Sequence, residues 1–441
     1  MEGFWIKALQ LILSLSILVI LHELGHFIPA RLFKTRVEKF FLFFDWPRAM
    51  VKRKYGDTVY GIGVLPLGGY VKIAGMVDER MDKAQIKVPP KPWEFRSKPA
   101  WQRLIIMIGG VAVNVLLAFF IYAMLLYANG EQYLLVRNMK YGVVTDSIGH
   151  QIGFENGDKI LEIDGSLPQR SASLVPDILL SDSVLVARNG KQKTIYLGDA
   201  DKKRIIEESG RFYIRPRVPY AVARVVGNSE AERAGLRPGD RILAIAGKPI
   251  SFADEVVTEI PTHKGDTINL MVQRGDRRVS LAVFVPEKGK IGILGYGAAH
   301  FLKMETKAYG FFASFPAGVR RTHAVLNSYI EQFKLIFNPD TGAYKSLGGV
   351  GTLGKLFPDT WNWSAFWGVT AFLSIALAFL NILPIPALDG GHVVFVLWEL
   401  ITGKKPHQKV LEYAQIAGFC ILMTLILYAN GNDLIHLIFN R

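Results

Sequence analysis

Cysteine is nearly absent from this chain of 441 residues, in which Cys420 is the only one. A single thiol excludes an intramolecular disulfide and a cysteine-cluster metal site, so metal chemistry would need other side chains. Charged side chains are also missing from long apolar stretches, namely residues 8–21 (which run into an apolar segment at 22–30), 104–128, 360–388 and 413–432. Because roughly 20 helical residues cross a ~30 Å hydrocarbon core, these stretches predict four transmembrane helices and exclude a purely soluble globular enzyme.

Acidic residues are fewer than basic ones, 38 against 52, which gives a net charge of +14. The excess is densest between the first two apolar stretches, where residues 29–100 hold 15 Lys and Arg against 7 Asp and Glu. The connection between the last two stretches is also basic, with Lys404, Lys405 and Lys409. Because basic loops stay in the cytoplasm, we expect both connections inside, and both termini with residues 128–362 outside. The long outer segment has no basic stripe interleaved with aromatics, so no nucleic-acid partner is expected.

Residues 128–362 contain an internal repeat at an offset of 82 residues. HQIGFENGDKILEIDG (150–165) aligns without a gap with ERAGLRPGDRILAIAG (232–247), and seven of the 16 positions are identical. The pattern predicts a short helix ended by glycine, a Gly-Asp turn, an alternating strand and a second glycine turn. This pattern resembles PDZ domains, which accept extended peptide ends by strand addition. The alternative is a β-rich domain that was duplicated for bulk.

The first apolar stretch ends in LHELGHF, residues 21–27. His22 and His26 are four residues apart, so they share one helical face, where two imidazoles can bind one Zn²⁺ at ~2.0–2.1 Å. Glu23 lies on the neighbouring face, which suits a base acting on water rather than a third ligand. The alternative is a pair of ordinary core histidines. Ionisable groups in a membrane helix favour the metal site, since a central charge costs ~2.5–3.5 kcal/mol to insert.

A catalytic zinc site needs a third protein ligand and an open position. Spans one and three run in the same direction if all four stretches cross, so the third ligand is expected at the inner end of span three. That end reads NILPIPALDGGH (381–392), and Asp389 is its only carboxylate. Pro384 and Pro386 break the helix there, which a membrane tolerates where the freed backbone lines a cavity or faces water. The alternative role for Asp389 is a helix cap at the membrane interface.

Three motifs follow one another along the chain, namely HELGHFIPARLFKTRVEKF (22–40), PLGGYVKIAGM (66–76) and NILPIPALDGGH (381–392). Together they resemble the site-2 protease family of intramembrane zinc metalloproteases. Four spans with two PDZ-like modules between the second and the third are similar to its bacterial branch, the regulator of sigma-E protease type. The resemblance implies one Zn²⁺ per chain, held by His22, His26 and Asp389, with Glu23 activating the water. It also implies that Asn381 contacts the substrate backbone.

The expected fold is a polytopic α-helical membrane protein with four transmembrane helices, a membrane-associated β-rich loop at about 55–76 and two extramembrane PDZ-like α+β domains. The expected domains are residues 1–127 with the first two helices, 128–218 and 219–305 with the PDZ-like modules, 306–362 as a linker with an amphipathic or membrane-surface segment, and 363–441 with the last two helices.

The β-rich loop is expected on the same side of the membrane as the metal site. Residues 59–75 are strand-like and include Gly68 and Gly69. Their edge would accept an unwound substrate segment as an added strand. An ordinary hairpin with turn glycines is the alternative. Residues 348–354, GGVGTLG, leave three roles equally open: a hinge, a loop or a membrane-surface contact.

Together with these features, the resemblance implies a zinc endopeptidase of the bacterial inner membrane that performs regulated intramembrane proteolysis in a stress response. By resemblance, its substrates are single-span membrane proteins of the anti-sigma factor type, already trimmed outside, and remnant signal peptides. The PDZ-like pair would be a size gate or a docking site for trimmed ends. One rival is a membrane-anchored zincin acting on soluble or misfolded proteins, which needs a third ligand near HExxH, where residues 27–37 offer none. The other rival is a non-catalytic PDZ scaffold without zinc.

Overall fold

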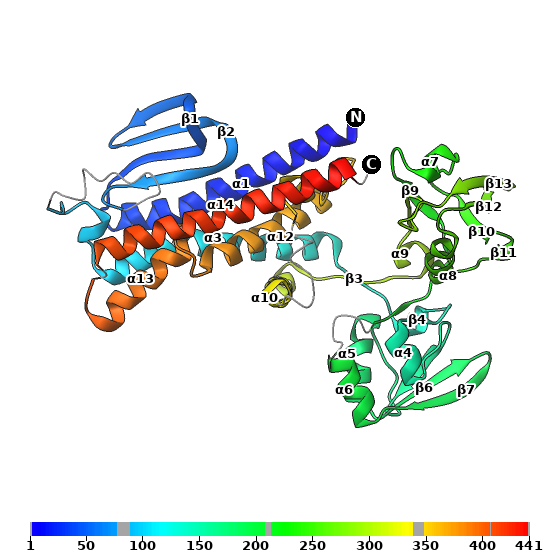
Figure 1. Ribbon diagram of the computed structural model, residues 1–441. Helices are drawn as coiled ribbons and strands as arrows, with labels where there is room; N and C mark the ends of the chain where they lie inside the picture. Colours follow the sequence, from blue (N-terminus) through cyan, green and yellow to red (C-terminus); the bar gives the residue numbers. More distant parts are fainter. Residues whose placement is uncertain (1, 77–88, 208–212, 338–347, 406, 440–441) are drawn as a thin grey trace. The chain divides into compact units, whose positions relative to one another are not determined.

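The computed structural model describes residues 2–76, 89–207, 213–337, 348–405 and 407–439 (Figure 1). The chain divides into two compact units. Unit 1 combines residues 1–130 with residues 308–440, and unit 2 covers residues 131–307.

Unit 1 is built on apolar helices. In the described part of the chain, four helices are long and apolar enough to cross a membrane, as the four charge-poor stretches predict. They are α1 (Glu2–Leu32), α3 (Ala100–Asn129), α12 (Trp363–Ile382) and α14 (Gln408–Phe439). Figure 1 shows α1 and α14 running along the bundle, with the start of α1 and the end of α14 at the same end of the unit.

Helix α3 packs closely against α1 at a pair of glycines. A Cβ atom at Gly109 would lie 1.9 Å from the carbonyl oxygen of Gly25, and one at Gly25 would lie 2.4 Å from the carbonyl oxygen of Gly109. The two backbones therefore touch, as small residues permit in membrane helix pairs. This approach brings the second half of α1 against the first half of α3.

The third apolar stretch is interrupted where the prolines predict. Helix α12 ends at Ile382, and a new helix, α13 (Asp389–Thr402), begins after the proline segment. The connection folds back so closely on the start of α13 that only glycine fits at position 390. A Cβ at Gly390 would lie 2.2 Å from the carbonyl oxygen of Leu383. The predicted break is confirmed, and it places Asp389 in the first turn of α13.

A curled sheet lies beside α1 (Figure 1) and is formed by β1 (Val37–Tyr55) and β2 (Thr58–Ile73). The first part of β1, residues 37–42, pairs with both halves of β2, at 59–62 and at 69–73. The β-rich region thus begins at Val37, well before the expected start near residue 55. Long bent strands with repeated register shifts do not show a regular alternation of apolar and polar residues. The sequence pattern therefore does not reveal the start of the strand at Val37.

Two further helices of unit 1 follow the return of the chain from unit 2. Helix α10 (Phe311–Phe337) packs on α3 through Phe315 and Phe119, whose ring centroids are 6.0 Å apart. Helix α11 (Val350–Gly354) lies in the glycine segment whose role the sequence leaves open. Its start is bound by α14, since the Asp433 carboxylate accepts hydrogen bonds from the backbone N–H groups of Gly349 (3.0 Å) and Thr352 (2.9 Å).

Unit 2 consists of short strands and helices. The strands are β3 (Glu131–Tyr133), β4 (Val143–Thr145), β5 (Lys159–Ile163), β6 (Ser183–Arg188), β7 (Lys191–Tyr196), β8 (Ile214–Pro216), β9 (Val222–Val225), β10 (Arg241–Ile245), β11 (Lys248–Pro249), β12 (Thr267–Arg274), β13 (Arg277–Phe284), β14 (Ile293–Gly295) and β15 (Glu305–Lys307). The α-helices are α4 (Ser147–Ile152), α5 (Leu174–Leu180), α6 (Asp199–Glu207), α7 (Glu230–Arg233), α8 (Ala253–Glu259) and α9 (Ala298–Phe301).

The two copies of the repeat form the same buried ion pair. In the second copy, Asp240 accepts two hydrogen bonds from Arg274 at 2.7 and 2.8 Å, and Arg274 also donates to the carbonyl oxygen of Gly235. In the first copy, Asp158 and Arg188 have the same relationship, with two hydrogen bonds of 2.7 Å. The aspartate of each Gly-Asp turn therefore fixes the turn to a neighbouring strand.

The end of the second expected module packs with the first. Residues 220–291 contribute one hydrophobic core, but Phe301, Leu302 and Met304 pack into the core formed by residues 134–214. These last residues lie within the expected range 219–305 but pack with the core of the preceding residues. The physical reason is chain closure, because β15 pairs antiparallel with β3, where the chain enters unit 2.

Candidate metal centre and active site

Helix α1 carries the first two candidate ligands. His22 and His26 are one helical turn apart and are 8% and 6% exposed. Their Nε2 atoms lie 3.3 Å from each other. The two imidazoles thus point to one place, as the four-residue spacing predicts.

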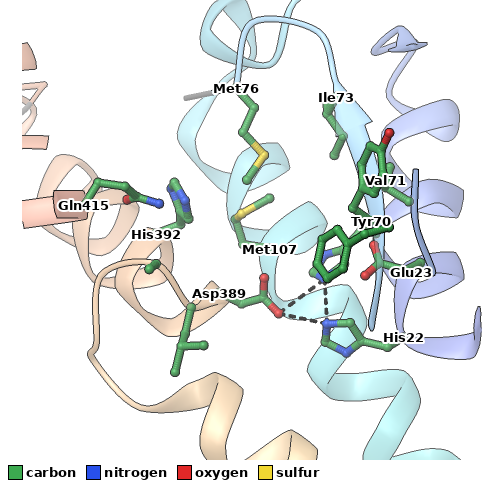
Figure 2. Close-up of a pocket in the computed structure, with 15 residues that line it drawn as sticks. His22, Glu23, Tyr70, Val71, Ile73, Met76, Met107, Asp389, His392 and Gln415 are labelled. Atoms are coloured by element: carbon green, nitrogen blue, oxygen red, sulfur yellow. Dashed lines mark hydrogen bonds and ion pairs between the residues drawn. The ribbon is translucent and has the colours of Figure 1, made fainter. Parts of the chain in front are cut away.

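Asp389 completes the cluster from α13. Its Oδ2 atom lies 3.2 Å from Nε2 of His22 and 3.3 Å from Nε2 of His26 (Figure 2). Helix α13 is itself held to α3 by an ion pair between Arg103 and Glu399, whose nitrogen and oxygen lie 2.5 Å apart. The structure therefore brings together all three residues that the sequence predicts as ligands, and they could hold a metal ion.

The geometry of the three donor atoms fits zinc. In a tetrahedral site with bonds of ~2.0–2.1 Å, neighbouring donor atoms are about 3.3 Å apart. The observed separations are 3.2, 3.3 and 3.3 Å. Nδ1 of His26 lies 2.8 Å from the carbonyl oxygen of Ile106, so this nitrogen carries the proton and Nε2 presents a lone pair. The Nε2 lone pair of His26 and the Asp389 carboxylate oxygen would repel each other, so a cation bound between these two atoms would stabilise the arrangement.

Two residues of α3 shape the cluster, and sequence reasoning missed both. Asn114 is completely buried, and its amide lies 3.1 Å from Nδ1 of His22. Gly110 leaves room for the imidazoles, because a Cβ there would lie 2.3 Å from Nε2 of His26 and 2.6 Å from Cε1 of His22. The available signal was an amide within the charge-free stretch 104–128, since a buried polar group needs a partner.

Glu23 borders the same cavity without belonging to the three-residue cluster. Its carboxylate faces the backbone of Val71 in β2, which lines the same cavity. Figure 2 shows Glu23 between α1 and the strand that carries Tyr70 and Val71. Glu23 thus lies beside the three candidate ligands, and its role as a base stays a prediction.

The cavity has a volume of about 230 Å³ and extends from the three candidate ligands (the metal cluster) to one edge of the sheet. Gly69 lines it, whereas Gly68 precedes it with a φ of +147° that favours glycine. A Cβ at Gly69 would lie 2.6 Å from the Val19 side chain, so this glycine lets β2 approach α1. His392 lines the cavity on the α13 side and is not part of the metal cluster.

Asn381 also reaches the cluster. Its Nδ2 atom lies 3.2 Å from Nε2 of His22, on the last turn of α12. The amide is therefore placed where it can contact a group bound beside the metal ligands. Whether it binds the substrate backbone, as the sequence resemblance implies, stays a prediction.

Comparison with known proteins identifies the family of this chain. The family model described as Peptidase family M50 matches residues 10–425. The chain belongs to peptidase family M50. The "Regulator of sigma E protease" of Haemophilus influenzae is 28% identical to this M50 peptidase over 450 residues, covering 97% of the chain and 98% of the relative. A protein named "Putative zinc metalloprotease" in Treponema pallidum is 28% identical over 451 residues, with the same two coverages.

A third relative, from Vibrio cholerae and also named "Putative zinc metalloprotease", is 29% identical over 449 residues, covering 96% of the chain and 97% of the relative. These matches confirm the family that the three sequence motifs resemble. They also confirm the expected enzyme class, a metalloendopeptidase, and the expected zinc cofactor. Both rival interpretations lose support, because the family match extends over nearly the whole chain and the third candidate ligand lies far from HExxH.

Proposed function

We propose that this M50 peptidase cleaves peptide bonds within the membrane-spanning segments of other proteins. The supporting observation is the position of the metal cluster. His22 and His26 lie well inside α1, and the cluster is buried between helices that are apolar enough to span a membrane. A site for soluble substrates would be expected outside such a bundle.

In this proposal, His22, His26 and Asp389 hold the zinc ion, which supplies Lewis acidity to the site. Glu23 accepts the proton of the attacking water and transfers it to the leaving amine. Glu23 and the Val71 backbone line the same cavity, so the carboxylate can reach a water molecule there. Asn381 donates a hydrogen bond to the carbonyl group that is under attack, because its amide lies beside His22.

The edge of β2 would hold the substrate. A transmembrane helix hides its amides in internal hydrogen bonds, so it must unwind before hydrolysis. Residues 69–73 form an outer segment of the curled sheet, and all of them except Lys72 line the cavity beside Glu23. An unwound segment added to this edge would bring its peptide bond toward the metal cluster.

The substrates we propose are single-span proteins of the anti-sigma factor type and remnant signal peptides, each after prior trimming. One relative is named for regulation of sigma E, which supports this class. From the two basic connections we infer that the inner side of the protein faces the cytoplasm of a bacterium and that unit 2 and both termini lie in the periplasm. The two repeated modules of unit 2 would then act as PDZ-like domains that exclude bulky substrates or dock trimmed ends.

The test uses the purified full chain and a pre-trimmed single-span substrate, with and without a zinc chelator. Cleavage within the span that stops with chelator and returns with zinc would support the proposal. Glu23→Gln should keep stoichiometric zinc yet lose cleavage by ~10²–10⁴-fold. Asp389→Ala should instead lose zinc by elemental analysis. Cleavage confined to soluble proteins, or turnover by the Gln variant, would contradict it.

A further inference from the structure

A second cavity lies outside the metal centre, where α1 ends and β1 begins. Its volume is about 470 Å³, which is within the ~300–1,000 Å³ typical of small-molecule sites. The lining residues are Arg31, Lys34, Thr35, Arg36, Asp57 and Trp93. Three cations and one carboxylate give the lining a net positive charge, which favours an anionic occupant.

Main-chain hydrogen bonds hold the walls of this cavity together. The N–H of Arg36 donates to the carbonyl oxygen of Trp93 at 2.9 Å, and the N–H of Ala74 donates to the carbonyl oxygen of Arg36 at 2.9 Å. Lys98 adds a bond from Nζ to the carbonyl oxygen of Lys34 at 3.3 Å. These bonds join residues 34–36 to residues 74, 93 and 98, so the backbone that carries the cationic side chains is held in place.

Most of the cationic charge at this cavity is not paired with a carboxylate of the described residues. Arg36 pairs with Asp57 at 3.6 Å, and the two side chains are 42% and 63% exposed, so the pair is weak. Within the described ranges, Arg31 and Lys34 have no carboxylate at ion-pair distance. Two cations are therefore available to an anion.

The backbone at Lys34 suggests that its side chain has a function. Lys34 has a φ of +55°, and the N–H of Thr35 donates to the carbonyl oxygen of Ala30 at 2.8 Å. This arrangement is a Schellman end of α1, in which glycine is the favoured residue at the position of Lys34. A lysine in this strained conformation is expected where its charge is needed.

The surroundings indicate an amphiphile rather than a free ion. Ile28 and Leu32, one turn apart on α1, are 51% and 73% exposed, and the candidate span ends at Leu32. Trp93 and Trp101 are also partly exposed near this end, as tryptophans are at membrane interfaces. An apolar strip thus leads along the span to the cationic cavity.

We propose that this cavity binds the phosphate headgroup of an anionic phospholipid, whose acyl chains lie along Ile28 and Leu32. Arg31 and Lys34 contact the phosphate, and Trp93 fixes the depth of the headgroup. Phosphate chemistry is shared with free inorganic phosphate, and the apolar strip favours the lipid as its source.

The experiment titrates the full chain, in a neutral detergent, with short-chain phosphatidylglycerol, with phosphatidylcholine of equal chain length and with inorganic phosphate. Native mass spectrometry measures the bound fraction. Lys34→Gly and Arg31→Gln should each weaken phosphatidylglycerol binding about fivefold. Lys404→Gln is the matched control, because it removes an exposed cation from another connection and should leave binding unchanged.

Folding does not confound Lys34→Gly, because glycine suits the φ of +55° and the melting temperature should not fall. Equal binding of the two lipids would overturn the proposal. So would equal affinities of Lys34→Gly and Lys404→Gln for phosphatidylglycerol. Inorganic phosphate that binds as tightly as the lipid and displaces it would assign the cavity to a free anion instead.

Discussion

The side-chain amide of Asn114 lies 3.1 Å from Nδ1 of His22, on the side of the imidazole opposite the Asp389 carboxylate. Its Oδ1 atom is buried and has no hydrogen-bond partner among the described residues. Exchanging the amide oxygen and nitrogen would let Oδ1 accept the Nδ1 proton of His22. Nε2 would then keep its lone pair for a metal ion. In that arrangement, Asn114 would position the His22 imidazole.

Replacing Asn114 by Leu should weaken zinc binding by ~10–100-fold, because the tautomer and orientation of His22 are no longer fixed. Asn114→Asp should restore much of this affinity, since a carboxylate can accept the same proton. Competition with a chelator of known affinity measures the effect independently of proteolysis. Asn129→Leu, at the exposed end of the same helix, is the control. Equal zinc affinity of the wild-type chain and Asn114→Leu would remove this role.

Gly110→Ala should abolish stoichiometric zinc binding. The added methyl group would lie 2.3 Å from Nε2 of His26, which is closer than van der Waals contact allows. The matched substitution is Gly368→Ala in α12, where the nearest atom to a new Cβ is 4.0 Å away. That variant should keep its zinc and gain about 0.4–1 kcal/mol of stability. Full zinc occupancy in Gly110→Ala, by elemental analysis, would contradict the packing argument.

The sequence predicts the parts of the site that follow local rules. The four-residue spacing places His22 beside His26 on one helical face. The number of spans predicts that spans one and three run in the same direction, which points to Asp389 at the inner end of span three. Gly110 and Asn114 do not follow from such rules, because their role depends on which face of α3 meets α1. The early start of the sheet at Val37 has a similar cause, since residues 37–42 pair with two separate parts of β2.

Asn381→Ala should lower cleavage by ~10²–10³-fold while zinc binding is retained, if its amide stabilises charge on the carbonyl under attack. The expected loss is in kcat, because that interaction strengthens in the transition state. Steady-state kinetics with the trimmed single-span substrate, together with zinc analysis, test this. A rise in KM alone would indicate that Asn381 only binds the substrate backbone. Loss of zinc would make it a support for His22.

In unit 2, the pair between Asp240 and Arg274 should make the second module sensitive to acid. Burial raises the pKa of Asp240, but the hydrogen bonds from Arg274 and from the backbone N–H of Arg237 outweigh burial and lower it below the ordinary 3.8. A lowered pKa means that this stabilisation is present above pH 3.8 and is lost as the pH falls through the folded-state value. Amide protection of β10 should therefore decrease below about pH 4.

Asp240→Asn should reduce the stability of the second module at neutral pH by roughly 1.5–3 kcal/mol, because the charged hydrogen bonds to Arg274 are lost. Hydrogen exchange should show faster exchange in β10 and unchanged exchange in β5. Asp158→Asn is the reciprocal control and should affect β5 alone. Identical exchange profiles for the two variants would show that the pairs do not act within their own modules.

The pairing of Lys307 with Glu131 has a consequence for how such a protein can be assembled. The chain leaves the helical unit after Gly130 and returns to it at Ala308, and the two points are linked by one strand spacing, about 4.8 Å. Everything in between is topologically an insertion with adjacent ends. An insertion of this kind can be enlarged, exchanged or duplicated without moving the ends of the host helices. The two repeated modules can therefore change in sequence or number while the helical unit that carries the candidate site keeps its fold.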